Sequence, residues 1–336
     1  MKRILLSLLC VICTLPFTSC NKDRYTIHSG TAQGTLYHII VKNAPRDIEQ
    51  RIAAVFEKAD QTFSMFNPES IISRINRNET RQTNFEFREC YMIAEMVNSI
   101  SYGYYDITVK PLVDAWGFGP GPRSEHPNVD SLLQFVGMYR TKIENGLLLK
   151  QRLGVQLDMS SVAKGYTADM MARMLVDQGI HDFLVEIGGE VICAGKNSRG
   201  NNWRVGIDAP IPDTDILNQR KPELQAVLDI TGKGIATSGN YRNYFINEAG
   251  DRIVHTINPK TGYPMDSKVV SATVISNSCA AADALATLLM AAGGTDEFLQ
   301  IIQNFSLSDD YYIIYIGDDG ELETLMSKGF EKYLVK

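Results

Sequence analysis

The order of helical and extended segments is the feature that most constrains the fold of this chain. Residues 183–276 hold a succession of short apolar or alternating runs joined by Gly-rich connections, as packed strands do. Helical spacing of apolar residues comes in clusters before and after this region. Helices and strands therefore do not alternate strictly, and the pattern predicts an α+β fold rather than a doubly wound parallel sheet.

The individual elements follow from periodicity and from turn-forming residues. We expect helices at 47–63, 86–100, 160–179, 278–294 and 296–305, and strands at 36–41, 155–157, 183–195, 203–208, 224–230, 268–276 and 311–317. Ser160 or Ser161 can cap the third helix, and Gly179 can end it. The segment GPGPRSEHPN, residues 119–128, is the clearest loop or subdomain joint.

The first twenty residues differ from the rest of the chain. Lys2 and Arg3 precede the run ILLSLLCVICTLPF, which has the form of a secretory signal and is too short to span a bilayer. The run ends in FTSC, which resembles a site where the cysteine is lipidated. We therefore expect a signal peptide over 1–19, Cys20 as the lipidated N-terminus, a short tether over 20–30 and a single domain over 31–336. Such a chain is an exported bacterial lipoprotein, anchored on the periplasmic side of a membrane, most simply the inner one.

Composition narrows the class of protein. Hydrophobic residues make up 44% of the 336 and charged residues 21%, as in an ordinary globular enzyme or binding domain. After removal of residues 1–19, the chain has 31 Lys and Arg and 39 Asp and Glu, which gives a formal charge of about −8. This negative charge argues against nucleic acid as a partner. Cys90, Cys193 and Cys279 form no CxxC or metal-ligand spacing, so we expect them to be buried as small hydrophobic residues.

Two Gly-rich segments could approach a ligand closely. In EIGGE, residues 186–190, the paired glycines indicate either a bulge or a backbone that lets a ligand come near. In ATSGNYRNYF, residues 236–245, hydroxyls and turn formers could cradle a phosphate, but a polar hairpin turn explains them equally well.

Two further segments carry charged groups at helical spacing. Asp283 and Thr287 lie four residues apart, so on a helix both oxygens face the same way and suit Mg²⁺. The alternative is that Asp283 complements the helix dipole while Thr287 bonds to the preceding turn. In DMSSVAKGYTAD, residues 158–169, a helix start with Lys164 could attract an anion, or could be a capped helix with a solvated lysine.

Motifs of other enzyme classes are missing from the sequence. It has no Walker loop, no GxGxxG after a strand, no HExxH and no GxSxG. Its five histidines never fall at metal-ligand spacing. Nicotinamide, zinc and acyl-serine chemistry are therefore poor interpretations.

The segments taken together, in their order along the chain, resemble the FAD:protein FMN transferase family, known as ApbE. The resemblance runs from about Gly34 to Leu334 and rests on FSMFNPESIISRIN (63–76), YYDITVKPLVDAWGFGP (104–120), LDMSSVAKGYTAD (157–169), EIGGE, WRVGIDAP (203–210), ATSGNYRNYF, HTINPKTGYP (255–264) and AADALAT (281–287). It implies mixed and antiparallel sheets packed with helices, in two intertwined subdomains with the FAD site between them.

The resemblance also implies a reaction and its residues. FMN would pass from FAD to a Thr or Ser hydroxyl of an acceptor flavoprotein, such as a membrane redox-pump subunit, with Mg²⁺ as cofactor and release of AMP. The positions that match the family's FAD site are Gln33, Ser64, Met65, Phe66, Tyr104, Tyr105, Asp106, Asp158, Lys164, Thr237, Ser238 and Gly239. The positions that match its metal ligands are Asp283, Thr287 and the backbone carbonyl of Ala163.

His255 matches the position from which a base would act. Histidine has an unperturbed pKa of about 6.5, so its side chain can accept a hydroxyl proton at neutral pH. We predict that His255 activates the acceptor hydroxyl and that the turn NPKTGYP holds its ring in place. Two residues depart from the family pattern: Asn258 stands where Asp is more common, and Gln33 replaces a common methionine.

Other functions stay open on the sequence alone. Water could replace the acceptor hydroxyl, which would make the protein a Mg²⁺-dependent FAD pyrophosphatase that yields FMN and AMP. A lipoprotein that binds FAD without turnover is a second alternative, although storage needs no metal. A role in assembling another cofactor lacks metal-cluster ligands in the sequence.

Overall fold

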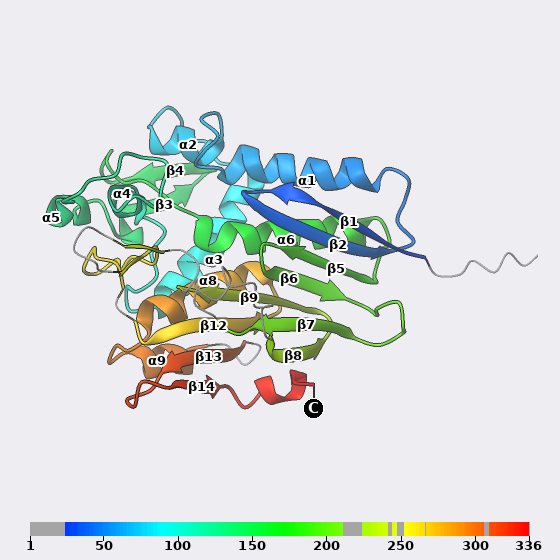
Figure 1. Ribbon diagram of the computed structural model, residues 1–336. Coiled ribbons are helices and arrows are strands. Elements are labelled where there is room, and N and C mark those ends of the chain that lie inside the picture. The colour runs from blue at the N-terminus through cyan, green and yellow to red at the C-terminus, as the bar shows by residue number, and fades with distance from the viewer. Residues whose placement is uncertain are drawn as a thin grey trace, which may run out of the picture.

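The computed structural model describes residues 24–210, 224–240, 244–246, 252–265, 267–305 and 309–335 (Figure 1). Its largest element is an eight-stranded sheet in which all neighbouring strands run antiparallel. Across the sheet the order is β1 (Tyr25–Ala32), β2 (Thr35–Lys42), β5 (Phe183–Ile187), β6 (Glu190–Ala194), β9 (Lys233–Gly239), β12 (Val269–Ser276), β13 (Asp310–Ile316) and β14 (Leu322–Met326).

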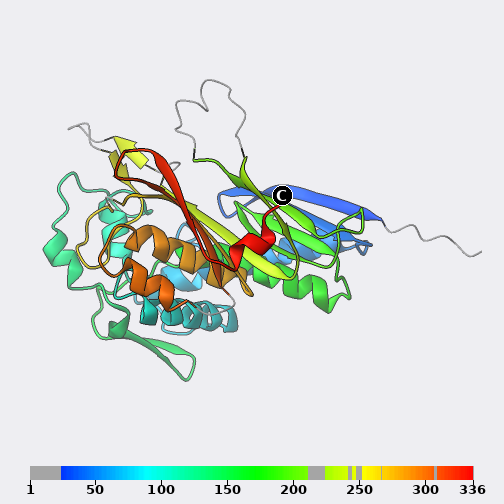
Figure 2. The same ribbon diagram turned by 90° about the horizontal axis from the view of Figure 1, so that it is seen from below.

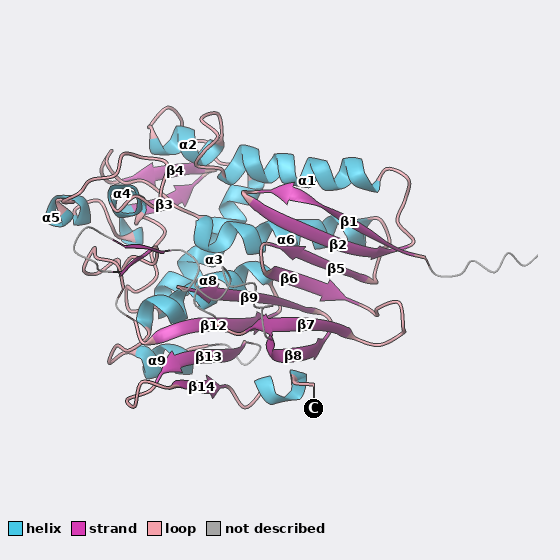
Figure 3. Ribbon diagram, viewed as in Figure 1, coloured by secondary structure: helices cyan, strands magenta, loops and turns pink. Residues whose placement is uncertain are grey.

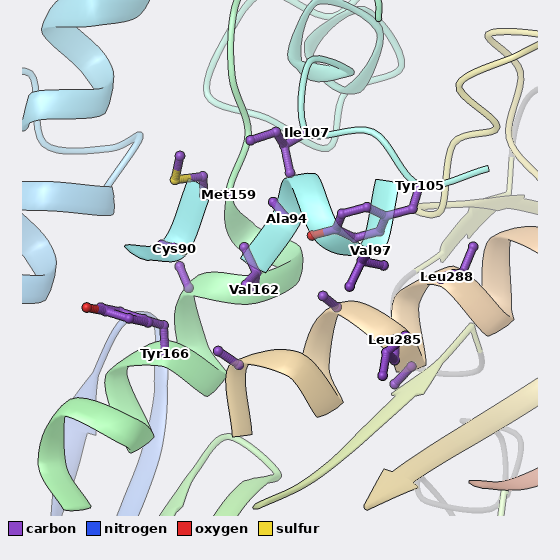
Figure 4. Packing of buried hydrophobic residues seen from close by; sticks show 14 of the residues in the cluster. Cys90, Ala94, Val97, Tyr105, Ile107, Met159, Val162, Tyr166, Leu285 and Leu288 are labelled. Carbon is purple, nitrogen blue, oxygen red and sulfur yellow. The ribbon is translucent and has the colours of Figure 1, made fainter. Parts of the chain in front are cut away.

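The long helices cover one face of this sheet. They are α1 (Ile48–Phe63), α3 (Phe85–Ile100), α6 (Ser160–Asp177) and α8 (Cys279–Ala292), with α9 (Phe298–Gln303) following α8 (Figures 1 and 2). Small and branched side chains let these helices approach one another. Figure 4 shows Ala94 and Val97 of α3 in the same cluster as Val162 of α6 and Leu285 of α8, all of them buried.

A smaller layer covers the opposite face. Along β12, Val274 belongs to the helix-side core, whereas its neighbour Ile275 packs in a second cluster with Trp203 and Phe330. That cluster comes from the hairpin of β7 (Trp203–Asp208) and β8 (Leu224–Ile230) and from the 3₁₀ helix η2 (Phe330–Tyr333). The period of two that marks a strand therefore places one core on each side of the sheet.

The remaining short elements lie mainly at one end of the sheet, where loops separate them (Figure 3). They are α2 (Ile71–Asn76), α4 (Lys110–Ala115), α5 (Val129–Leu133), η1 (Met138–Arg140), β3 (Thr141–Glu144), β4 (Leu147–Lys150), β10 (Tyr244–Ile246) and β11 (Arg252–Val254). A separate small core joins α4 and α5 to the chain after β11 through Leu112, Val129 and Ile257. We refer to α2, α4, α5, η1, β3 and β4 as the end lobe.

The α+β prediction is confirmed, because the sheets are antiparallel and the helices are grouped. Cys90, Cys193 and Cys279 are buried and free, as expected. The signal peptide and Cys20 lie outside the described residues. Within the described ranges, none of the helices combines the length and apolar character needed to cross a membrane.

Several local expectations were wrong. Residues 25–30, expected in a tether, form part of β1, which pairs with β2 through a two-residue turn at Gln33 (φ 52) and Gly34 (φ 73). The strand expected at 155–157 is only an isolated bridge between Val109 and Gln156. Neither Ser160 nor Ser161 caps α6; instead Asp158 Oδ1 accepts a hydrogen bond from Ser160 N at 2.8 Å.

Candidate functional site

A cavity of about 740 Å³ lies where the end lobe, the sheet and the long helices meet. A volume of this size lies in the range of sites that bind small molecules and cofactors. Of the residues predicted from the sequence, those that line it are Met65, Phe66, Tyr104, Tyr105, Asp106, Asp158, Lys164, Thr237, Ser238, Gly239, His255, Asp283 and Thr287. Segments far apart in the sequence therefore converge on one space.

The start of α6 faces this cavity. Ser160, Ser161 and Lys164 all line it, and they stand in the first turns of an 18-residue helix. Ser161 Oγ donates to the Tyr105 hydroxyl at 3.1 Å, which ties the helix to the loop after α3. Unpaired N–H groups and the positive end of the helix dipole favour anions at such a place.

A hairpin turn brings a carboxylate to Lys164. The glycines of EIGGE form neither a bulge nor a strand interior: Gly188 and Gly189 have φ of 63 and 105 and join β5 to β6. Glu190, the first residue of β6, is 3% exposed and accepts from Lys164 Nζ at 2.5 Å. Its second oxygen, Oε2, is buried and has no hydrogen-bond partner among the residues that the structure describes. Such a group calls for an explanation, because buried polar atoms are normally paired.

The charges of this cluster are unbalanced. Burial and the nearby Asp283 carboxylate raise the pKa of Glu190 to about 8, even though Lys164 opposes the shift. Burial also raises the pKa of Asp283, against the influence of Lys164. Burial disfavours the charged form of Lys164, but Glu190 and Asp283 outweigh it and raise the pKa of the ammonium. Two carboxyl groups therefore share one cation in a buried space, and added positive charge would stabilise them.

Asp283 and Thr287 project from α8 toward the same space. Asp283 is 4% exposed, and its Oδ2 accepts from Gly165 N at 3.0 Å. Thr287 Oγ1 lies 3.4 Å from Ser238 Oγ at the end of β9. The helix is capped by Ser278, whose side chain accepts from Ala281 N. Asp283 lies beyond the first turn of α8, where the dipole effect has largely fallen off, and this argues against the dipole explanation.

The oxygen groups here fit a small hard cation. A carboxylate and hydroxyls are the donors that Mg²⁺ takes, and it usually needs only one or two of them from protein. The described residues contain no group of three or more His, Cys, Asp or Glu that could hold a metal. The pair on α8 is of a different kind, since it combines the carboxylate of Asp283 with the hydroxyl of Thr287, and the Ser238 hydroxyl lies beside Thr287. The charge imbalance around Glu190 and Asp283 points the same way.

His255 follows β11 and lines the cavity beside the end lobe. Its ring lies 6.3 Å from the ring of Phe118 in an edge-on arrangement. The next residue, Thr256, donates from Oγ1 to Asn240 Oδ1 at 2.8 Å and so joins this segment to the end of β9. His255 is therefore placed by β11 on one side and by a hydrogen-bonded turn on the other.

The residues after His255 form the predicted turn. Asn258 N donates to Tyr263 O at 2.9 Å, and Gly262 N donates to Asn258 O at 2.7 Å. Asn258 Oδ1 also accepts from Lys260 N at 2.8 Å, a role that an aspartate oxygen fills equally well. The departure at Asn258 is therefore compatible with the turn. Trp116 Nε1 of the end lobe donates to Gly262 O at 2.8 Å and holds the far end of this turn.

Apolar and aromatic side chains form the rest of the lining. Phe66 is 77% exposed at the cavity, and Tyr104 donates from its hydroxyl to Glu297 Oε2 at 3.1 Å. Asp106, in contrast, is occupied within the protein: it accepts from Thr108 N and from Met138 N, both at 2.8 Å. Burial raises its pKa. Asp106 thus shapes the loop around the cavity.

Three predicted residues do not line the cavity. Gln33 Nε2 donates to Thr167 Oγ1 at 2.9 Å, and Thr167 Oγ1 donates to the carbonyl of Ala163 at 2.7 Å. Thr167 thus joins Gln33 to the carbonyl of Ala163, whose oxygen has a second lone pair that an ion can take. Ser64 organises the loop after α1, where its carbonyl accepts from the Ser70 hydroxyl at 2.6 Å.

Sequence reasoning missed several residues of the lining. They are Val109, Val113, Gly117, Phe118, Glu190, Tyr244, Thr256, Ile257, Pro259, Met290 and Ala291. Ser160, Ser161 and Gly188 also line the cavity, and they come from segments that the sequence had marked for an anion or a ligand. Glu190 could have been recognised from the sequence, because a carboxylate beside paired glycines in an apolar run is unusual and indicates a functional role. Met290 and Ala291 could not have been recognised, because they look like any other apolar residues of a core helix.

Comparisons with known proteins show the family of this chain. The sequence profile of the ApbE family matches residues 33–310. A FAD:protein FMN transferase from Haemophilus influenzae is 32% identical, over 99% of this chain and 98% of its own length. One from Vibrio cholerae is 34% identical, over 83% of this chain and 85% of its own length.

Solved structures of ApbE proteins have the same fold as this chain. The flavin transferase ApbE from Vibrio cholerae has a TM-score of 0.80 and 31% identity, covering 93% of this chain and 100% of that chain. The apo flavinyl transferase ApbE from Pseudomonas stutzeri has a TM-score of 0.78 and 26% identity, covering 92% and 96%. With a family profile matching most of its length and relatives that span nearly all of it, the chain belongs to the ApbE family.

Proposed function

We propose that this protein transfers the FMN part of FAD to a Thr or Ser hydroxyl of an acceptor flavoprotein, with Mg²⁺ as cofactor and AMP as the second product. The family and the names of its relatives support flavin transfer. The observation that carries the chemistry is one cavity that gathers Asp283 and Thr287 of α8, Lys164 of α6 and the turn of His255.

The reaction replaces one phosphorus–oxygen bond by another. The acceptor hydroxyl oxygen bonds to the phosphorus on the riboflavin side, the bond from that phosphorus to the bridging oxygen breaks, and AMP leaves with that oxygen. His255 accepts the hydroxyl proton. Lys164, whose pKa is raised by Glu190 and Asp283 against the effect of burial, stays charged beside the phosphates. Mg²⁺ held by Asp283, Thr287 and the carbonyl of Ala163 would neutralise phosphate charge.

Asp283→Ala tests the metal part of the proposal. We expect Mg²⁺-dependent release of AMP to be lost, while FAD binding without metal stays within about two-fold, because the apolar lining is intact. The measurement pairs AMP release with FAD fluorescence titration. Asp130→Ala, an exposed carboxylate of α5, is the matched control. Unchanged AMP release in Asp283→Ala contradicts the metal role.

The acceptor is tested by covalent flavin. The mature protein, FAD and Mg²⁺ are incubated with a candidate acceptor domain, such as that of a membrane redox-pump subunit, and the denatured gel is read for flavin fluorescence. We expect fluorescence on the acceptor that disappears with EDTA. AMP formed without acceptor would instead support the FAD pyrophosphatase, and FAD that stays intact with acceptor and Mg²⁺ would support a binding protein without turnover.

The proposal includes a place in the cell. The N-terminal signal with FTSC before Cys20 supports an exported lipoprotein anchored on the periplasmic side of the membrane. Radioactive palmitate should label the wild type and leave Cys20→Ser unlabelled. Equal labelling of the two proteins contradicts the assignment.

A further inference from the structure

The proposed metal ligands are divided between two helices. The carbonyl of Ala163 belongs to α6, whereas Asp283 and Thr287 belong to α8. An α-helix advances about 1.5 Å per residue, and Mg²⁺ demands near-octahedral ligands at about 2.0–2.1 Å. A slip of α8 along α6 by a fraction of one residue is therefore enough to spoil the site, so something must fix the register of the two helices.

Asp169 bridges the helices one turn away from the site. From α6 its Oδ1 accepts from Cys279 N at 2.9 Å, and its Oδ2 accepts from Ala280 N at 3.0 Å and from the Ser278 hydroxyl at 2.7 Å. The first N–H groups of α8 thus find their acceptor on the neighbouring helix. A negative charge at a helix N-terminus adds to the attraction.

The contact continues toward the site in steps of one helical turn. Gly165, four residues before Asp169, donates its N–H to Asp283, four residues after Cys279. The backbones are close here, because a Cβ on Gly165 would lie 2.4 Å from the Cys279 carbonyl oxygen. Asp169 and Gly165 therefore make two successive contacts that join α6 to α8. The second of these contacts is the hydrogen bond to the carboxylate of Asp283.

We propose that Asp169 is a positioning residue that fixes α8 against α6 and so sets the geometry of the metal site. Asp169 is not among the described residues that line the cavity, so it acts through the helices. The inference rests on the proposed function, because it takes Asp283 and Thr287 as metal ligands. It adds a residue that neither contacts FAD nor binds the ion.

Asp169→Asn tests the role with Mn²⁺, which takes the same oxygen donors as Mg²⁺ and is visible by electron paramagnetic resonance. The change keeps the size of the side chain but turns one acceptor into a donor that faces N–H groups. We expect Mn²⁺ to bind about 10–100-fold more weakly in the presence of FAD, as for other residues that support metal ligands. FAD affinity without metal should change by less than about two-fold.

A second helix cap separates positioning from stability. Asn84 caps α3 by accepting from Phe87 N at 2.9 Å, and α3 carries none of the proposed ligands. Like Asp169→Asn, Asn84→Ala removes a helix cap and should lower the urea midpoint of unfolding, but its Mn²⁺ affinity should stay within about two-fold of wild type. Equal Mn²⁺ affinities in Asp169→Asn and Asn84→Ala, whether reduced or not, overturn the inference.

The remaining outcomes are also decisive. If Asp169→Asn does not fold, Ser278→Ala replaces it; this change removes one partner of Asp169, and a loss of a few-fold in Mn²⁺ affinity supports the inference, whereas no loss overturns it. Wild-type protein that binds no Mn²⁺ overturns the metal role in the proposed function and the inference with it. If wild type and Asp169→Asn both bind Mn²⁺ with equal affinity, the proposed function stands and only the role of Asp169 is removed.

Discussion

Glu190 shares its buried place with Lys164 and Asp283, and this single residue sets much of the electrostatics of the cavity. Its pKa is raised to about 8 by burial and by Asp283, so near neutral pH the folded protein holds a proton that the unfolded chain has released. The folded state therefore loses stability as the pH rises.

Glu190→Gln should flatten this pH dependence. The stabilising effect of the proton is fully present below the ordinary glutamate value of 4.5 and is lost as the pH rises toward about 8. Without divalent ions, the melting temperature of wild type should fall across that window, and that of Glu190→Gln should fall less. Glu144→Gln, an exposed control, should follow wild type. Parallel curves for all three proteins contradict the assignment.

His255→Ala should slow the chemistry more than it weakens binding. Loss of a general base typically costs ~10²–10⁴-fold in rate, whereas the other walls of the cavity still hold the dinucleotide. The two quantities are AMP release at saturating FAD and the FAD dissociation constant. Equal losses in both would mean that His255 positions FAD and does not accept the proton.

At the scale of elements, the close contact of α6 and α8 depends on Gly165. In an exposed helix, Gly→Ala stabilises by about 1 kcal/mol. Here the added methyl would lie 2.4 Å from the Cys279 carbonyl oxygen, so we expect Gly165→Ala to destabilise by about 1–3 kcal/mol in urea unfolding. Asp177→Ala, at the exposed end of the same helix, is the control. A stabilised Gly165→Ala protein would show that the helices can separate without cost.

The sequence predicted the long helices well and several strands badly. Helix α1 carries several turns of regular apolar spacing, and α8 is an apolar run too long for an ordinary strand, so both give a strong signal. The hairpin of β3 and β4 has only four residues in each strand, and β1 carries polar residues on both faces, so neither was predicted. Pairing partners decide such strands, and pairing is a tertiary property.

The candidate site was predictable where polar residues are out of place in an apolar context. Asp283 sits in an almost wholly apolar helix, and His255 precedes a turn that does not require it. The contact between α6 and the start of α8 was not predictable. Asp169 accepts hydrogen bonds from residues 278–280, which lie about 110 positions away in the sequence. No local pattern in the sequence records a partner at that distance.

At the scale of the whole molecule, a surface cluster ties the turn of His255 to other parts of the fold. Lys260 Nζ lies 3.2 Å from Glu297 Oε1 and 4.2 Å from the centre of the Tyr104 ring. The Tyr104 hydroxyl donates to the same carboxylate. Three segments separated along the chain are thus held together beside the cavity.

Lys260→Met should loosen this link while keeping the apolar stem. An exposed pair contributes about 0.3–1 kcal/mol, so we expect the transfer rate to fall about two- to five-fold at low salt. At high salt the two proteins should converge, because screening weakens the pair in wild type. Lys268→Met, which removes a surface pair with Asp318, is the control and should leave the rate unchanged. An equal deficit at both salt concentrations contradicts an electrostatic role.

The cavity draws its walls from nearly the whole chain, from Met65 in the loop after α1 to Ala291 near the end of α8. A ligand that binds only the native state stabilises it in proportion to its occupancy. Under the proposed function, we therefore expect FAD to protect only a finished molecule from proteases, because a chain that ends before Asp283 lacks the part of the cavity wall that α8 supplies.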